Sequence, residues 1–262
     1  HMTTKGPKEG KIDLYAQCDG LFKVDVVRLD RVNALEDVMI ATRHSNTPVK
    51  AGDKLAGTRI IPLVIAKERM DIIKEAAGAA PLLRLLPYQP MRVGVVTTGS
   101  EVYHGRIPDR FTPVIEKKLA EYHLEINEHR LCSDDKAMIQ KAVEELLELN
   151  MDMVLCTGGM SVDPDDRTPA AIKATGAQIV TYGAPVLPGA MFMLAYTADG
   201  RVIMGLPGCV MYAKRTIFDL ILPRVVCGER VSRADIRALG HGGLCLECEQ
   251  CRYPSCSFGK GN

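Results

Sequence analysis

Tryptophan is absent from this chain of 262 residues, and aromatic residues make up only 5% of it. The formal net charge is +1, so neither sign of charge dominates. No apolar run approaches the roughly 20 residues that cross a bilayer, and the first residues show no secretory signal pattern. These absences argue against nucleic acid and membranes as partners. We therefore expect a cytoplasmic protein.

One stretch in the middle of the chain carries the clearest functional signal. Residues 153–156 are apolar and predict a buried strand of a parallel sheet. Gly158 and Gly159 follow, and a loop without side chains can approach a ligand closely. Thr168 before Pro169 marks a helix start, where free amide groups favour an anion. The pattern predicts a ligand-binding loop, although an ordinary turn between strand and helix has the same composition.

Three carboxylates crowd this loop: Asp163, Asp165 and Asp166. Carboxylates repel a phosphate unless a cation lies between them, so the pattern favours Mg²⁺ at this position. The acids alternatively bind hydroxyl groups or ring nitrogens of a ligand. Either interpretation gives the loop a role in polar recognition or chemistry.

A second buried strand and its loop precede this stretch. Residues 92–97 predict the strand, and the loop 98–101 follows it. A helix near Pro113, a strand over residues 124–130 and a helix from Ser133 lie between the two loops. This β-α-β-α-β order predicts a parallel sheet, with its ligand at the carboxyl ends of the strands.

The next elements extend the same sheet. Residues 177–181 predict a strand, and residues 191–204 predict a hairpin at the edge of the sheet. The loop 205–208 then leads into a helix over residues 209–222, with Pro223 marking its end. A third loop is thus expected to meet the start of a helix.

Residues 91–226 contain four motifs: Thr98-Gly99-Ser100-Glu101-Val102, Thr157-Gly158-Gly159-Met160-Ser161-Val162-Asp163 with a later Asp166, Pro188-Gly189-Ala190-Met191, and Leu206-Pro207-Gly208. In this order they resemble the molybdopterin-binding domain shared by molybdenum-cofactor biosynthesis proteins, and they are closest to the molybdopterin molybdotransferase type. The resemblance implies an α/β fold with a doubly wound, mostly parallel sheet. It also implies a small-molecule pterin ligand.

The resemblance implies roles for individual residues. Molybdopterin would contact Thr98, Gly99, Ser100, Thr157, Gly158, Gly159, Ser161, Asp163, Asp165, Pro188, Gly189, Pro207 and Gly208. Within this set Gly158, Gly159 and Ser161 would hold the terminal phosphate of the pterin. Glu101, Asp109 and Asp166 would be catalytic and would face the dithiolene, metal or nucleotide end, with Mg²⁺ held by Asp166 and a neighbouring acid. Asp109 taken alone also fits a solvated turn residue.

Several positions depart from the molybdotransferase pattern. Asp163 replaces a loop glycine, Pro169 replaces a frequent lysine, Phe111 replaces an asparagine, and Cys209-Val210 replaces Asn-Pro. Three functions therefore stay open. The chain is a transferase involved in metal insertion, a non-catalytic molybdopterin carrier or sensor, or a pyridine-nucleotide hydrolase of the competence-damage-inducible type.

The second notable feature is the cysteine spacing near the C-terminus. Cys245, Cys248, Cys251 and Cys256 lie within twelve residues. Four thiolates at this spacing suit Zn²⁺ or an iron–sulfur cluster, and the spacing does not separate the two. The alternative is a tail of free cysteines. Cys209 follows a motif loop, and a predicted helix start there would lower the pKa of its thiol and make it reactive.

These signals divide the chain into three parts. We predict a β-rich N-terminal module over residues 10–88, a molybdopterin-binding domain over residues 89–228, and a cysteine-rich, metal-binding tail over residues 229–262. The expected partners are the pterin, a molybdoenzyme or cofactor-pathway protein, and further copies of the chain, because relatives in the family form oligomers.

The N-terminal module is predicted from local patterns. Residues 21–29 and 37–42 favour strands, residues 49–57 carry turn chemistry, and residues 66–77 suit a helix. His1-Met2 resembles an expression-tag remnant, so the prediction starts after it.

Overall fold

The computed structural model describes residues 1–161 and 167–261, and the three loop acids at positions 163, 165 and 166 lie outside the described residues. The chain divides into two compact units, residues 1–88 and residues 89–262. We call them unit 1 and unit 2 and describe each by itself.

Unit 1 contains a four-stranded sheet in the order β1-β2-β6-β4, a three-stranded sheet in the order β5-β3-β7, and two helices. Its elements are β1 (Met2–Lys8), β2 (Lys11–Ala16), β3 (Gly20–Val24), α1 (Val26–Asn33), β4 (Val38–Thr42), β5 (Thr47–Val49), β6 (Lys54–Ile60), α2 (Lys67–Ala77) and β7 (Leu83–Pro87). Every strand pairing in it is antiparallel.

The predictions for unit 1 were right for β4 and α2 and wrong in three places. The turn expected over residues 49–57 is shorter, because β6 begins at Lys54. The strand expected over residues 21–29 ends at Val24, because Asp25 accepts a hydrogen bond from the amide of Arg28 and starts α1. The residues before position 10, outside the predicted module, form the edge strand β1 and pair with β2.

Unit 2 contains a six-stranded sheet in the order β11-β12-β13-β10-β8-β9. Its elements are β8 (Val93–Thr98), α3 (Ser100–Tyr103), α4 (Thr112–Ala120), β9 (Ile126–Cys132), α5 (Lys136–Glu148), β10 (Met153–Thr157), α6 (Thr168–Ala174), β11 (Gln178–Tyr182), β12 (Met193–Tyr196), β13 (Val202–Leu206), a 3-10 helix η1 (Gly208–Met211), α7 (Ile217–Val226) and α8 (Arg233–Ala238).

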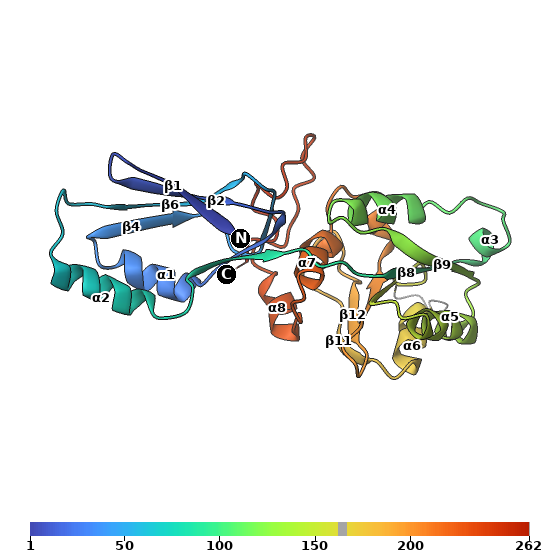
Figure 1. Cartoon of the computed structure of the whole chain (residues 1–262). Helices are drawn as coiled ribbons and strands as arrows, with labels where there is room; N and C mark the ends of the chain where they lie inside the picture. Colours follow the sequence, from blue (N-terminus) through green and yellow to red (C-terminus); the bar gives the residue numbers. More distant parts are fainter. Residues whose placement is uncertain (162–166, 262) are drawn as a thin grey trace. The chain divides into compact units, whose positions relative to one another are not determined.

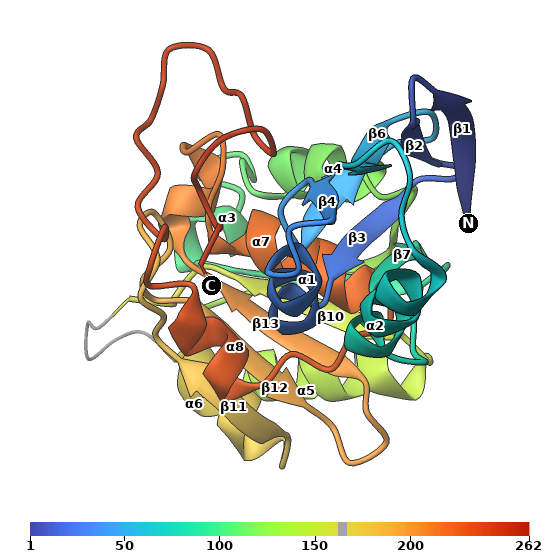
Figure 2. The same cartoon turned by 90° about the vertical axis from the view of Figure 1, so that its left-hand side faces the viewer.

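The sheet of unit 2 is mostly parallel and is covered on both faces. Strands β9, β8, β10 and β13 run parallel, while β12 runs antiparallel to both β13 and β11. Helices α4 and α7 lie on one face, and α5 and α6 lie on the other (Figures 1 and 2). Every residue of β8, β10 and β13 is buried, as expected for strands covered on both faces. The predicted doubly wound α/β fold is confirmed.

Three details of unit 2 differ from the prediction. β9 begins at Ile126, two residues later than expected. The hairpin of β12 and β13 lies inside the sheet, because β11 takes the edge. The helix expected from position 209 is divided into η1 and α7, and Pro223 lies inside α7 instead of ending it. All ten residues of α7 are buried, so packing outweighs the cost of the proline.

None of the helices in the described part of the chain combines the length and apolar character that crossing a membrane requires.

Candidate functional site

Three motif loops leave the same edge of the sheet in unit 2. Thr157, the last residue of β10, lies level with Thr97 of β8 on one side and Leu206 of β13 on the other. Because these strands are parallel, the loops that follow them start side by side. The structure therefore brings together segments that are far apart in the sequence, as expected for ligand sites in open α/β sheets.

The loop after β10 approaches the loop after β8 very closely. Gly158 has a φ of +85°, and a Cβ atom there would lie 2.4 Å from the carbonyl oxygen of Thr98. Gly159 has a φ of +54°, and its Cβ would lie 2.9 Å from Oγ1 of Thr168. The Thr168 hydroxyl in turn donates to the carbonyl oxygen of Gly158 at 2.9 Å. Glycine is therefore required at both positions for conformational and steric reasons.

Some polar groups of this loop have no hydrogen-bond partner among the described residues. Thr157 is fully buried, and its Oγ1 has no hydrogen-bond partner among the described residues. The amides of Gly159 and Ser161 donate no hydrogen bond within the described part of the chain. The carbonyl oxygen of Ser161 accepts from the Tyr182 hydroxyl at 3.0 Å. A buried hydroxyl without a partner is costly, so this loop has the polar groups that a ligand would satisfy.

A cavity of about 490 Å³ opens beside the loop that follows β8. It is lined by residues 97–102, 107–111, 134 and 211–212, and we call it the sheet-edge cavity. Gly99 has a φ of +142°, and the next amide, of Ser100, donates to Asp134 at 2.8 Å. Glu101 is exposed beside them. The cavity thus contains the predicted residues Thr98, Gly99, Ser100 and Glu101.

Asp109 also lines this cavity, but its oxygens have partners within the protein. Its carboxylate accepts from the amides of Phe111 at 2.8 Å and Thr112 at 3.1 Å, which are among the free amides at the start of α4. It also accepts from the hydroxyls of Thr112 at 2.5 Å and Thr97 at 3.2 Å, and Nε2 of His129 lies 3.6 Å away. Burial opposes ionisation, yet these hydrogen bonds outweigh it and lower the pKa of the Asp109 carboxyl.

The remaining two motifs lie at the same end of the sheet. Gly189 has a φ of +120°, and a Cβ there would lie 2.6 Å from the side chain of Ile217, so this motif packs on the start of α7. The Pro188 carbonyl accepts from the amide of Ile217 at 3.3 Å. Pro207 is buried, whereas Gly208 is exposed with open space where a Cβ would be. Gly208 is therefore the part of this motif that a ligand can reach.

The four tail cysteines and one motif cysteine line a separate cavity of about 380 Å³. Its cysteines are Cys209, Cys245, Cys248, Cys251 and Cys256, and we call it the cysteine cavity. Within the described residues, no three His, Cys, Asp or Glu side chains are grouped closely enough to hold a metal ion. The prediction of a reactive Cys209 was wrong, because burial raises the pKa of its thiol.

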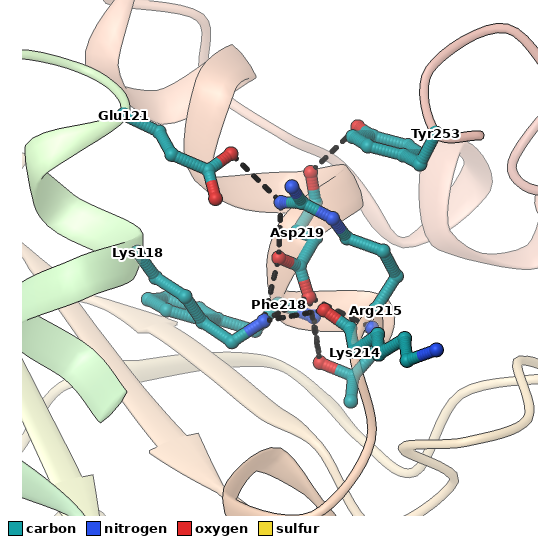
Figure 3. Close-up of polar contacts among 8 residues, drawn as sticks. Lys118, Glu121, Lys214, Arg215, Phe218, Asp219 and Tyr253 are labelled. Carbon is teal, nitrogen blue, oxygen red and sulfur yellow. Dashed lines mark hydrogen bonds and ion pairs between the residues drawn. The ribbon is translucent and has the colours of Figure 1, made fainter. Parts of the chain in front are cut away.

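A buried cluster of charges, which sequence reasoning missed, lies between α4 and α7 (Figure 3). Asp219 is 2% exposed and accepts from Nζ of Lys118 at 2.7 and 2.8 Å. Arg215 donates to Asp219 at 2.9 Å and to Glu121 at 2.8 Å. Asp219 also forms a capping box with Thr216, and this spacing is the one sequence signal that marks it. Its partner on α4 lies 101 residues away.

The fold and these loops define an α/β protein whose candidate site lies at the carboxyl edge of a mostly parallel sheet. Residues 94–226 match the sequence family described as a probable molybdopterin binding domain. The chain belongs to this family.

Individual relatives match over shorter parts or at low identity. A CinA-like protein of Mycobacterium marinum is 34% identical over 77 residues, which are 29% of this chain and 18% of the relative. A CinA-like protein of Mycobacterium sp. strain MCS is 35% identical over 81 residues, 31% of this chain and 19% of the relative. The chain thus covers less than a fifth of the curated relatives it matches.

Among solved structures, the molybdopterin biosynthesis enzyme MoaB of Thermus thermophilus aligns with 21% identity and a TM-score of 0.42. The alignment covers 53% of this chain and 98% of that one.

Proposed function

We propose that unit 2 binds molybdopterin, or its adenylylated form, at the carboxyl edge of its sheet and takes part in molybdenum cofactor biosynthesis. The observation that carries this proposal is the loop after β10. Its buried Thr157 hydroxyl has no partner in the described part of the chain, and it lies where three motif loops meet. Membership of the molybdopterin-binding family supports the choice of a pterin as the ligand.

The loop offers donors that suit an anionic group. In this proposal the terminal phosphate accepts from the amides of Gly159 and Ser161, which donate to no other described residue. Thr157 lies directly before them and supplies its hydroxyl from the strand end. The pterin and dithiolene end extends toward the sheet-edge cavity, beside Ser100 and Glu101.

Magnesium does not fit the acids that the structure describes. Asp109 already accepts hydrogen bonds from three residues, and Glu101 belongs to no metal-binding group of described side chains. The proposal for Mg²⁺ therefore depends on Asp166 with Asp163 or Asp165. If molybdate insertion needs this ion, Asp166→Ala abolishes transfer, and full transfer by that variant would overturn the magnesium proposal.

The first experiment is an anaerobic titration with molybdopterin. The chain has no tryptophan, so the fluorescence of the pterin can be followed without that background. We expect saturable quenching with a Kd on the order of micromolar. Pterin fluorescence that rises in proportion to the added pterin, without saturable quenching, would overturn the pterin proposal.

A pair of threonine variants tests whether the Thr157 hydroxyl contacts the ligand. Thr157→Val removes a buried hydroxyl with no described partner, so we expect equal or higher stability and a loss of pterin affinity of about tenfold or more. Thr168→Val removes the hydroxyl that donates to Gly158, so it should cost about 1 kcal/mol of folding free energy. Urea denaturation measures the stability of both variants, and the titration measures their affinity. Wild-type affinity in Thr157→Val would contradict the proposed contact.

Measurements of turnover distinguish the two alternative functions, a molybdopterin carrier or sensor and a pyridine-nucleotide hydrolase, from the proposed one. Saturable binding without molybdate transfer favours a carrier or sensor. The CinA-like relatives and the acids of the loop favour the pyridine-nucleotide hydrolase alternative. Incubation with NAD or ADP-ribose and Mg²⁺, followed by chromatography of the nucleotides, tests it. A partner molybdoenzyme and self-association remain predictions.

A further inference from the structure

The cysteine cavity gathers five of the nine cysteines of the chain. Four come from the tail, at positions 245, 248, 251 and 256, and the fifth is Cys209 of the Leu-Pro-Gly motif. No cysteine in the described part of the chain forms a disulfide bond. Cys209 is distant from the other four in the sequence, so the fold is what brings it to the same cavity.

Both ends of the tail loop are fixed to the body of unit 2. At its start, the amide of Cys245 donates to the carbonyl of Leu187 at 2.8 Å. At its end, the amide of Gly259 donates to the carbonyl of Gly242 at 2.9 Å, and the preceding Phe258 is 3% exposed. The loop therefore closes on itself, and its first and last cysteines lie beside anchored backbone.

The buried charge cluster fixes the loop a second time (Figure 3). The hydroxyl of Tyr253 donates to the backbone carbonyl of Asp219 at 2.9 Å. The guanidinium carbon of Arg215 lies 4.9 Å from the centre of the Tyr253 ring, and Glu121 and Asp219 hold that guanidinium in place. A tyrosine of the loop thus contacts the backbone of the buried Asp219 and the guanidinium of Arg215.

A third anchor holds the loop between its second and third cysteines. Nζ of Lys214 donates to the backbone carbonyls of Cys248 at 3.3 Å and Glu249 at 2.5 Å. This contact uses backbone atoms, so it leaves the thiol of Cys248 free. Cys248 and Cys251 are exposed, while Cys245 and Cys256 are partly buried.

We propose that the loop 242–259 binds one thiolate-coordinated metal centre through Cys245, Cys248, Cys251 and Cys256. Each thiol gives its proton to solvent as its sulfur binds either Zn²⁺ or a preassembled iron–sulfur cluster that brings its own sulfide, so the binding step involves no oxidation. The centre is a zinc ion or an iron–sulfur cluster, since four thiolates bind either. This inference does not rest on the proposed function.

The anchors explain how the site forms from the present arrangement. The described residues hold no ready group of three metal ligands, so the sulfurs must converge. Residues 246–252 form no helix or strand, so they can move without breaking regular structure. The anchors at Tyr253 and Lys214 keep that movement short. Tyr212 lines both this cavity and the sheet-edge cavity, so the metal centre would lie next to the candidate ligand site.

The test uses the full chain purified without oxygen. Elemental analysis should give about one zinc per chain, or about four irons with visible absorption. Cys251→Ser should weaken metal binding at least about tenfold, whereas Cys18→Ser, in unit 1, should leave it unchanged. Equal metal content in wild type and Cys251→Ser would overturn the proposal, as would wild-type protein that takes up neither metal.

A thiol count makes the test independent of the variants. Metal-loaded wild-type protein should show about four fewer thiols that react with a disulfide reagent than protein stripped by a chelator. Equal counts would contradict the proposed ligands even if Cys251→Ser fails to fold. Pterin binding measured on the same stripped protein separates failure of this inference from failure of the proposed function.

Discussion

The two cavities of unit 2 are built in different ways. The sheet-edge cavity owes its shape to backbone conformation, since parallel strands end side by side and glycines turn the chain back at φ values that other residues avoid. The cysteine cavity is bounded by a loop without helix or strand, fixed by the backbone carbonyl of Asp219 in α7 and by the side chains of Lys214 and Arg215 just before α7. The first depends on strand ends and glycine loops that local motifs predict, whereas the second depends on a buried charge cluster that no local motif predicts.

The largest effect should come from the charge cluster. Asp219→Ala leaves Lys118 and Arg215 buried without their shared carboxylate, so we expect a loss of about 3–5 kcal/mol in the free energy of unfolding. The measurement is urea denaturation. The control is Lys141→Ala, which removes a helix-surface pair with a lysine that is 77% exposed and should change little.

The same variant separates the two cavities. Under conditions where Asp219→Ala is folded, metal uptake by the tail should fall while pterin binding persists. Equal losses of both would mean that the cavities are not built independently, and an unchanged urea midpoint would contradict the role of the cluster.

The backbone of the sheet edge is tested by a pair of glycines. Gly158→Ala places a Cβ 2.4 Å from the Thr98 carbonyl at a φ of +85°. Gly176→Ala has a similar φ of +79° but meets nothing within 4 Å. We expect Gly176→Ala to cost about 1 kcal/mol and Gly158→Ala about 2–4 kcal/mol. The difference between the two losses of unfolding free energy, from denaturation of both variants, measures the steric cost of the contact with Thr98. Equal losses would show that the positive φ alone requires glycine at position 158.

Acid titration tests whether Asp109 supports the site or contacts the ligand. Its lowered pKa means that the ionised carboxyl favours the folded state. That contribution is complete above the ordinary value of 3.8 and is lost as the pH falls through the lowered value. Asp109→Asn should lose about 1 kcal/mol at neutral pH, with the difference from wild type shrinking in acid. Pterin affinity should change little, and a loss of about tenfold or more would make Asp109 a ligand contact.

Sequence reasoning found what local pattern determines. The apolar runs of β8 and β10 identified the parallel core, and the glycine motifs marked loops that the structure brings to one edge. It failed where a signal was weaker than a competing one. The apolar alternation after position 20 hid the Asp25 cap of α1, and the Leu-Pro-Gly motif suggested a helix start that belongs to Thr216.

The rest could not be read from one sequence. Lys118 is an ordinary helix lysine until α7 places Asp219 against it, and no local pattern encodes a pairing across 101 residues. The partnerless hydroxyl of Thr157 is likewise a property of packing, because nearby threonines such as Thr97 find partners. A sequence shows which polar groups a chain contains, but whether each group finds a hydrogen-bond partner depends on the fold.

The smallest predicted effect concerns Tyr253, which anchors the loop that bounds the cysteine cavity. Tyr253→Phe keeps the ring beneath Arg215 and removes the hydroxyl that donates to the Asp219 carbonyl, so we expect a loss of about 1 kcal/mol. Tyr212→Phe is the control, because Tyr212 is 77% exposed and lines both cavities. If anchoring positions the cysteines, Tyr253→Phe weakens zinc binding a few-fold while Tyr212→Phe does not. If the metal alone orders the loop, both variants bind zinc as wild type does, and the anchors stabilise the fold without preparing the site.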